Sequence, residues 1–243
     1  MTIIIPMAGL SQRFINEGYT LPKYMLYIGN RSMFNLSVSS FKKYFKSAVF
    51  IFIARDIFES ERFIKSECHL MGIKNFKIVI IDYTTKGQAE TVYIGINKVE
   101  IPKKENIFIF NIDTIRLNFS LPSNISVQDG YLEVFEGSGK NWSYAEPLDN
   151  ISRRVKRTAE KVEISNLCST GLYFFKSKKY FCEVYEKEKD SVVELYIAPL
   201  YNSMISNDKK IFYHLIQKED VIFTGTPNEY IDLINFNHKN PLV

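Results

Sequence analysis

Short runs of apolar residues alternate with amphipathic stretches along the first half of the chain. Each run is rich in β-branched or aromatic side chains and is bounded by polar or glycine-containing loops, which is typical of buried strands. Four such strands are predicted, at residues 3–5, 48–53, 76–81 and 106–111. Apolar residues between these strands recur at helical spacing, which predicts helices over residues 34–45, 56–71 and 88–99.

This alternation of strands and helices predicts an α/β fold. We expect a Rossmann-like three-layer domain with a mostly parallel central sheet and helices on both faces. Ligands of such sheets bind at the carboxyl ends of the strands. The loop after the first strand, the loop at Gly87 and the side chain of Asp113 are all expected at that edge.

The pattern changes from residue 128 onwards. Short strands are predicted at residues 131–135, 142–145, 155–157, 169–175, 211–216 and 220–223, with helices beginning near Ser191 and at residues 226–229. We expect these strands to form a small β-rich subdomain laid against the sheet on its substrate side. No linker or repeat separates the halves 1–127 and 128–243, so a single domain 1–243 is predicted.

Composition narrows the class of protein only a little. A hydrophobic content of 46% with 24% charged residues is ordinary for a globular domain, and the net charge of +4 comes without the basic tract that nucleic-acid binding would favour. The three cysteines and three histidines form no metal-binding or disulfide pattern. The first strand is too short for a signal peptide or a membrane span. We therefore expect a cytoplasmic protein that binds neither nucleic acid nor membranes. A homo-oligomer is compatible with these observations.

The loop after the first strand has the composition of a phosphate-binding loop. A glycine-bearing loop lets backbone N–H groups approach phosphate oxygens, and nearby Arg or Lys side chains neutralise the phosphate charge. Arg13 ends this loop, and Lys23 follows a proline on a stiffened turn. The loop itself consists of Ala8, Gly9, Leu10 and Ser11.

This segment resembles the N-terminal signature of the sugar-phosphate nucleotidyltransferases, a strand followed by Gly-x-Gly-x-Arg-Phe and then Pro-Lys. The match lies at residues 9–14 and 22–23, with Ser11 at the second glycine. The motifs Ile-Pro-Met-Ala-Gly and Gly-Tyr-Thr-x-Pro-Lys are similar to the bacterial capsule and surface-polysaccharide branch. The resemblance extends from Ile3 to about Tyr230 and implies a nucleotide-binding half 1–127 and a sugar-phosphate-binding half 128–243.

Asp113 follows the apolar strand 106–111. A carboxylate at that point can hold Mg²⁺, although an aspartate that simply ends a strand in a turn has the same appearance. The resemblance places the family's metal-binding aspartate at Asp113, and Asn111 is expected in the nucleotide site. Family members commonly carry a second metal aspartate shortly before a Gly-Thr near the end of the chain, where this sequence has Phe223.

The loop at Gly87 is the candidate base-binding segment. Thr85 could cap the following helix. The resemblance implies instead that Gly87, Gln88 and Ala89 contact the nucleotide base, partly through backbone groups, and Thr85 is included in this site. An amide side chain with backbone groups fits a pyrimidine edge and does not choose between cytosine and uracil.

The candidate acceptor site lies in the second half. Glu160 and Lys161 end a predicted strand and read locally as an exposed charge pair, but the resemblance implies that they bind the acceptor, with Lys161 on its phosphate. Thr170 and Gly171 match the family's strand that lines the sugar pocket. Glu194 either forms a capping box with Ser191 or contacts sugar hydroxyls.

The implied reaction joins an NTP such as CTP, UTP or dTTP to a sugar or polyol phosphate and releases pyrophosphate. Both reactants are polyanions, so catalysis consists mainly of positioning and charge neutralisation. Arg13 would hold the leaving phosphates, Lys23 the α-phosphate, Lys161 the acceptor phosphate and Asp113 the Mg²⁺ cofactor. Two alternatives remain: a glycosyltransferase of related fold that uses a nucleotide-sugar donor, and a non-catalytic regulatory subunit that kept the pocket.

Overall fold

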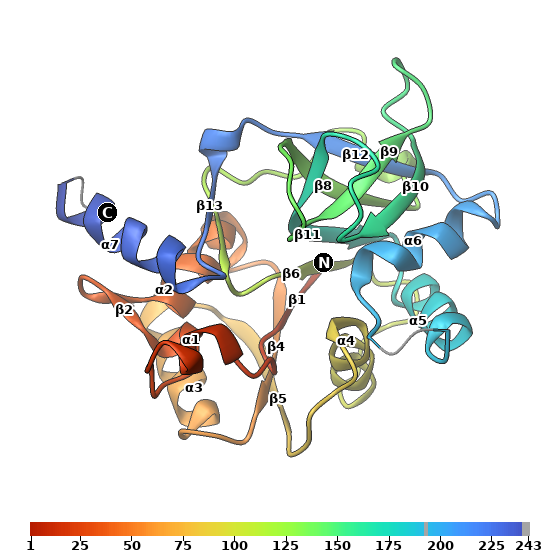
Figure 1. The fold of residues 1–243 in the computed structure, drawn as a ribbon. Coiled ribbons are helices and arrows are strands. Elements are labelled where there is room, and N and C mark those ends of the chain that lie inside the picture. Colours follow the sequence, from red (N-terminus) through yellow and green to blue (C-terminus); the bar gives the residue numbers. More distant parts are fainter. Residues whose placement is uncertain (192–193, 240–243) are drawn as a thin grey trace.

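A computed structural model describes residues 1–191 and 194–239, and one mixed sheet forms its centre (Figure 1). Within the described residues this sheet has nine strands, in the order β10-β9-β11-β6-β1-β4-β5, with β8 and β12 attached beside β11. The four strands predicted in the first half are parallel to one another: β1 (Thr2–Pro6), β4 (Val49–Arg55), β5 (Asn75–Ile81) and β6 (Ile107–Phe110). The predicted α/β fold with a mostly parallel central sheet is confirmed.

Helices cover both faces of the sheet. On one face, α2 (Met33–Val38) and α3 (Ser60–Met71) pack on one set of strand side chains, which includes Ile3 and Phe50. On the other face, α4 (Gln88–Asn97), α5 (Lys178–Glu188) and α6 (Ile197–Ile205) pack on the alternate set, which includes Ile4 and Ile51 (Figure 1). Because successive strand residues point to opposite faces and both faces are buried, the strands read as continuous apolar runs.

The second half of the chain extends the same sheet. β11 (Leu167–Phe175) pairs antiparallel with β6 and also with β8 (Gly130–Glu136). The sheet then continues through β9 (Ser143–Pro147) and β10 (Val155–Glu160), while β12 (Ile211–Leu215) pairs with β8. The expected β-rich half is therefore joined to the sheet edge to edge rather than laid against its face.

Two pairs of short strands form small sheets of their own beside the main sheet. β13 (Val221–Phe223) pairs with β7 (Thr114–Arg116), and β2 (Tyr27–Ile28) pairs with β3 (Arg31–Ser32). The remaining elements are α1 (Gln12–Asn16), η1 (Lys23–Met25), η2 (Ser39–Tyr44), η3 (Ile125–Val127), η4 (Lys218–Asp220) and α7 (Pro227–Lys239). No helix in the described part of the chain is long and apolar enough to cross a membrane.

Two helix predictions need correction. The helix expected over residues 34–45 is α2 followed by the 3₁₀ helix η2. The break falls at Phe41, whose side chain is fully buried and whose backbone adopts φ −102° and ψ 21°. The helix expected near Ser191 begins at Ile197 instead. The Ser191 hydroxyl donates to the carbonyl of Glu188 at 2.6 Å, so this serine lies against the end of α5 and caps no following helix. Residues 192 and 193 lie outside the described chain.

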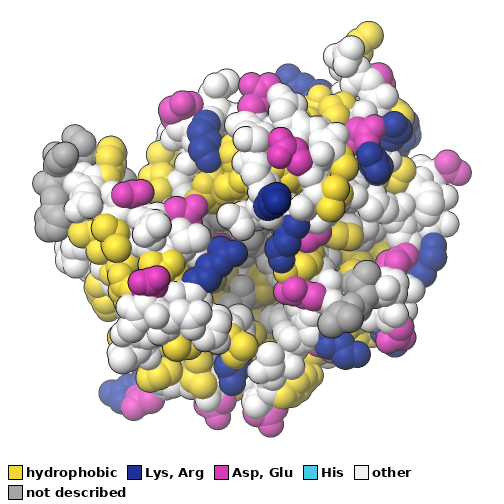
Figure 2. Space-filling view, viewed as in Figure 1, with side chains coloured by type: hydrophobic (Ala, Val, Ile, Leu, Met, Phe, Trp, Pro, Cys, Tyr) yellow, Lys and Arg dark blue, Asp and Glu magenta, His cyan; other side chains and the backbone are white. Residues whose placement is uncertain are grey.

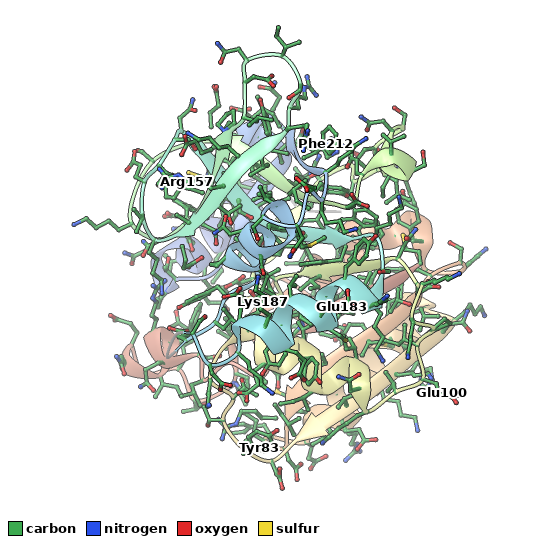
Figure 3. The ribbon with its side chains drawn as sticks, turned by 90° about the vertical axis from the view of Figure 1, so that its right-hand side faces the viewer. Tyr83, Glu100, Arg157, Glu183, Lys187 and Phe212 are labelled. Carbon is green, nitrogen blue, oxygen red and sulfur yellow. The ribbon has the colours of Figure 1, made fainter. Side chains whose placement is uncertain are left out.

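The helix α5 had no counterpart in the predictions. Its apolar side chains, Phe181, Val184 and Tyr185, are buried on the sheet side, while Glu183 and Lys187 are exposed. Figure 3 shows α5 in front of the sheet with these two labelled residues on it. The Ser177 hydroxyl accepts from the backbone N–H of Tyr180 at 3.1 Å and caps the helix.

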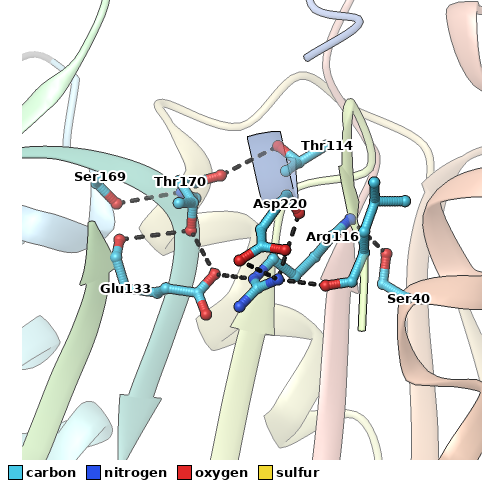
Figure 4. Close-up of polar contacts among 9 residues, drawn as sticks. Ser40, Thr114, Arg116, Glu133, Ser169, Thr170 and Asp220 are labelled. Atoms are coloured by element: carbon cyan, nitrogen blue, oxygen red, sulfur yellow. Dashed lines mark hydrogen bonds and ion pairs between the residues drawn. The ribbon is translucent and has the colours of Figure 1, made fainter. Parts of the chain in front are cut away.

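A buried polar network fixes the strand that follows Asp113. Arg116 Nε on β7 donates to Glu133 Oε1 on β8 at 2.9 Å, and Thr170 Oγ1 on β11 donates to the same oxygen at 3.2 Å (Figure 4). Burial raises the pKa of Glu133 against the lowering effect of the Arg116 charge. Thr114 Oγ1 also donates to the Thr170 carbonyl at 3.1 Å. Residues of β7 and β11 that border the cleft are therefore held in a fixed relation.

Candidate active site

One cleft at the carboxyl edge of the parallel strands collects the predicted site residues. Its volume is about 870 Å³, and several Lys and Arg side chains border the hollow at the centre of this face (Figure 2). The predicted residues that line it are Ala8, Gly9, Leu10, Ser11, Arg13, Lys23, Thr85, Gly87, Gln88, Asn111, Asp113, Glu160, Lys161, Thr170, Gly171 and Glu194. Ala89 is fully buried behind the cleft and does not line it.

The loop after β1 is tied to the turn that carries Lys23. Ser11 adopts a left-handed conformation, with φ 53° and ψ 30°, at the position where the family signature has its second glycine. A glycine is favoured there because it has no Cβ atom to oppose this conformation. The Ser11 hydroxyl accepts from the backbone N–H of Lys23 at 3.3 Å, which brings the two cation-bearing segments together.

Lys23 and Asp113 form an ion pair across the cleft floor. Lys23 Nζ lies 2.5 Å from Asp113 Oδ2, with side chains 21% and 26% exposed. Burial of the Asp113 carboxyl opposes its ionisation, but the charge and hydrogen bond of Lys23 outweigh this effect, so the pKa of Asp113 lies below its ordinary value. The Asp113 carboxylate is therefore ionised, with Lys23 as its cationic partner.

The donor set around Asp113 suits a divalent cation that brings other ligands with it. Mg²⁺ prefers oxygen ligands, and one or two carboxylates plus substrate phosphates are its usual partners. The described residues contain no group of three or more His, Cys, Asp or Glu side chains that could form a complete metal site. The backbone at Asp113 is fixed, because its carbonyl accepts from Thr224 N at 2.8 Å and Thr224 Oγ1 at 3.0 Å. An ion held here would depend on phosphate and water oxygens.

The candidate base-binding side is built on the start of α4. The helix begins after Gly87, so Thr85 is not its cap; Thr85 Oγ1 instead lies 2.7 Å from Thr91 Oγ1. Gln88 Nε2 donates to Asn111 Oδ1 at 2.5 Å, and Asn111 N donates to the Gly171 carbonyl at 3.1 Å. This contact holds the two cleft-lining amides against each other.

Gly87 allows α4 to pack directly on the chain at Leu195. A Cβ atom at Gly87 would lie 2.7 Å from the Leu195 carbonyl oxygen and 2.9 Å from its nitrogen. We expect Gly87→Ala to move the start of α4 and to lower nucleotide affinity at least about tenfold, with a loss of about 1–3 kcal/mol in the free energy of unfolding. Calorimetric nucleotide binding and thermal unfolding measure the two effects.

Gly95→Ala is the matched control for that variant. Gly95 is also in α4, but the three atoms nearest to its Cβ would all belong to the Ile53 side chain in the core. It should lower stability without lowering nucleotide affinity in the folded protein. Equal losses of affinity in both variants would mean that the Gly87 contact does not shape the nucleotide site.

The candidate acceptor side is built on the end of β10. Lys161 adopts φ 57°, and its Nζ donates to Tyr196 OH at 2.5 Å. This hydrogen bond is the main reason that the pKa of Lys161 lies above its ordinary value. Glu160 accepts a hydrogen bond from Ser143, and burial raises the pKa of the Glu160 carboxyl. The cleft therefore has the Lys161 ammonium held by Tyr196 and, at the preceding residue, the Glu160 carboxyl shielded from solvent.

An aromatic cluster occupies the place where the family commonly has its second metal aspartate. The Phe223 ring centroid lies 4.5 Å from that of Trp142 and 5.2 Å from that of Phe135. Lys218 Nζ lies 4.4 Å from the Phe223 centroid, and burial lowers the pKa of this lysine. Phe223 and Trp142 also line the cleft, so this position contributes an apolar wall rather than a metal ligand.

Sequence reasoning missed several residues that line the cleft. They are Trp142, Ser143, Tyr173, Tyr196 and Glu229. Tyr173 ends the segment 169–173 that resembles the family's sugar-pocket strand, whereas Trp142, Ser143 and Tyr196 belong to no local motif. Glu229 stands in the pattern Thr-x-x-Glu, which has the ordinary meaning of a helix cap.

No protein-family model and no curated protein matches the chain. Among solved structures, it is similar to a nucleoside-diphosphate-sugar pyrophosphorylase from Vibrio cholerae RC9, with 45% identity, coverage of 96% of this chain and 99% of that chain, and a TM-score of 0.91. A UDP-glucose pyrophosphorylase complexed with UDP-glucose aligns at 16% identity over 98% of both chains, with a TM-score of 0.74.

An inositol-1-phosphate CTP transferase from T. maritima aligns at 13% identity over 100% of this chain and 97% of that chain, with a TM-score of 0.72. These two distant structures bear on the fold alone. The identity of 45% to the Vibrio cholerae protein, over almost the whole of both chains, bears on the family. The chain therefore belongs to the nucleoside-diphosphate-sugar pyrophosphorylases, the sugar nucleotidyltransferases that join an NTP to a sugar phosphate.

Proposed function

We propose that this enzyme uses a pyrimidine nucleoside triphosphate, such as CTP, UTP or dTTP, and a sugar or polyol phosphate, and that its product supplies capsule or surface-polysaccharide synthesis. The observation that carries this proposal is one cleft bordered by Arg13, by the pair Lys23–Asp113 and by Lys161. Such a cleft can neutralise two polyanionic substrates at once. The first half, 1–127, would hold the nucleotide, and the second half, 128–243, the acceptor.

The reaction requires an acceptor phosphate oxygen to attack the α-phosphorus of the NTP. The new phosphorus–oxygen bond forms as the bond to the β-phosphate breaks, and pyrophosphate leaves with the negative charge. Arg13 would hold the leaving phosphates, Lys23 the α-phosphate and Lys161 the acceptor phosphate. Asp113 would hold a divalent cation, which neutralises phosphate oxygens when bound.

The choice of a pyrimidine follows from the resemblance of residues 87–89 to the family's base-binding segment, and the amide pair at the start of α4 is compatible with it. Gln88 lines the cleft, and because its Nε2 donates to Asn111, its side-chain carbonyl oxygen keeps its capacity as an acceptor. An acceptor suits the exocyclic amine of cytosine and the N3–H of uracil or thymine equally well. The proposal therefore covers all three pyrimidine triphosphates. The polysaccharide role rests on the motifs at residues 5–9 and 18–23.

Pyrophosphate release across a panel of CTP, UTP, dTTP, ATP and GTP with several sugar and polyol phosphates tests the proposal. We expect release with a pyrimidine triphosphate and only in the presence of a phosphorylated acceptor. Turnover confined to purine triphosphates would contradict the choice of base. Sugar transfer from a nucleotide-sugar donor without pyrophosphate release would favour the glycosyltransferase alternative.

Lys161→Ala should mainly raise KM for the phosphorylated acceptor and leave NTP affinity unchanged. We expect an increase of about 10- to 100-fold, because a charge-assisted contact to phosphate contributes roughly 1.5–3 kcal/mol. Steady-state kinetics measure the acceptor KM, and calorimetry measures NTP binding.

Lys156→Ala is the matched control, since Lys156 lies on β10, the strand that ends just before Lys161, but is 56% exposed and pairs with Glu146 outside the cleft. It should behave as wild type. If Lys161→Ala instead lost NTP affinity, Lys161 would belong to the nucleotide side of the cleft.

A further inference from the structure

Gly225 leaves an open space between two carboxylates from distant parts of the chain. A Cβ atom placed on Gly225 would lie 3.0 Å from Asp113 Oδ2 and 3.7 Å from Glu229 Oε2. Asp113 follows β6, whereas Glu229 is in the first turn of α7. All three residues line the cleft. The absence of a side chain at Gly225 thus creates a small cradle with an anionic oxygen on two sides.

Local structure holds Glu229 in this position. Glu229 Oε2 accepts from the backbone N–H of Thr226 at 2.9 Å, and Thr226 Oγ1 accepts from the backbone N–H of Glu229 at 3.3 Å. This reciprocal cap fixes the carboxylate at the start of α7 and occupies only part of its capacity, since a carboxylate offers about four acceptor positions. Among the described residues, no Lys or Arg side chain forms an ion pair with Glu229.

Other carboxylates near β13 do not serve the cradle. Asp220 precedes β13, and its half-exposed carboxylate lies 4.0 Å from Arg116 Nη1; it does not line the cleft. The position commonly filled by a metal aspartate is Phe223, which packs in the aromatic cluster. Glu229 is therefore the described carboxylate that shares the space next to Asp113.

We propose that Glu229 supplies the second carboxylate for the divalent cation that accompanies the triphosphate, in place of the aspartate that Phe223 has replaced. The cation would sit in the Gly225 cradle between Asp113 and Glu229, and phosphate and water oxygens would complete its shell. Mg²⁺ retains several waters in such sites, so Glu229 can act directly or through one of them. This inference rests on the proposed use of a nucleoside triphosphate.

Mn²⁺ binding to the enzyme with the α,β-methylene analogue of CTP or UTP tests the inference. The free Mn²⁺ signal in electron paramagnetic resonance gives the affinity of the complex for the ion. We expect Glu229→Gln to weaken Mn²⁺ binding by about 10- to 100-fold, the usual effect of losing an anionic group that supports a metal. Glutamine keeps the cap on α7, so thermal unfolding should be unchanged. Gly225→Ala should also weaken Mn²⁺ binding, because its methyl group would occupy the cradle.

Asp232→Asn is the matched control: it removes the same charge from the same helix at an exposed position outside the cleft. Its Mn²⁺ affinity should equal that of wild type. Wild-type affinity in Glu229→Gln, or an equal loss in Asp232→Asn, would overturn the role of Glu229. Calorimetric binding of the analogue to the wild type at saturating Mg²⁺ is the separate readout for the proposed function, and its complete failure would remove the basis of both.

Discussion

Lys23→Ala should lower kcat/KM by roughly 150- to 1,000-fold and leave the protein folded. Lys23 stands on a proline-stiffened turn, and its backbone is tied to Ser11 of the loop after β1. A charge-assisted contact made mainly in the transition state contributes roughly 3–4 kcal/mol, which corresponds to that loss of rate. Removal of Lys23 leaves the mostly buried Asp113 carboxylate without its partner, so the free energy of unfolding should fall by about 1–3 kcal/mol while the protein stays folded.

Single-turnover and steady-state kinetics measure the loss, and circular dichroism with thermal unfolding checks the fold. Lys42→Ala is a suitable control, because Lys42 is an exposed cation on η2 outside the cleft. The control should retain wild-type kinetics. A folded Lys23→Ala protein with near-normal kcat/KM would contradict the role given to Lys23.

The first half of the fold was predictable because its signals are local. A strand covered on both faces is a continuous apolar run, so β4 and β6 are visible in the sequence without knowledge of their neighbours. Once the sheet is parallel, the ends of β1 and β6 must meet at one edge. The placement of Asp113 near the first loop follows from that topology, and the structure confirms it at 2.5 Å from Lys23.

The errors occur where one side chain has two competing partners. Ser191 carries the pattern of a helix N-cap, but its hydroxyl instead donates to the last turn of the preceding helix at Glu188. That helix, α5, has a serine cap and apolar residues at 181, 184 and 185, so the sequence does carry local features that predict it. At Phe41 the side chain is fully buried in the aromatic core, and tertiary packing outweighs the helical period.

The walls of the cleft could not be predicted from local patterns, because they depend on contacts between residues far apart in sequence. Trp142 precedes β9 and Phe223 ends β13, and the two rings meet on Phe135 of β8; nothing in either segment indicates the other. Glu229 lies next to Asp113 because β13 pairs with β7 and because Thr224 bonds the Asp113 carbonyl. The local pattern Thr-x-x-Glu predicts that Glu229 caps a helix, but it does not indicate that Glu229 also lies near Asp113.

The ion pair between Lys23 and Asp113 also predicts how the cation binds. Lys23 already neutralises Asp113, so a divalent cation must displace an ammonium group to reach this carboxylate. A triphosphate offers Lys23 an alternative anionic partner and brings oxygen ligands for the cation. Nucleotide and cation are therefore expected to bind together.

Asp113→Asn should lower kcat by more than about a thousand-fold, because it removes the ionised ligand of the cation and the partner of Lys23 together. Asp232→Asn should keep wild-type activity.

In the nucleotide-free wild type, calorimetric titration should show no micromolar Mg²⁺ site, and the magnesium requirement should rise in step with nucleotide concentration. Lys23→Ala should raise the Mg²⁺ affinity of the nucleotide-free enzyme even though it lowers turnover. Without the Lys23 ammonium, the Asp113 carboxylate is available to the ion beside Glu229. Micromolar Mg²⁺ binding to the empty wild type would contradict this account, because it would mean that Lys23 does not compete for Asp113.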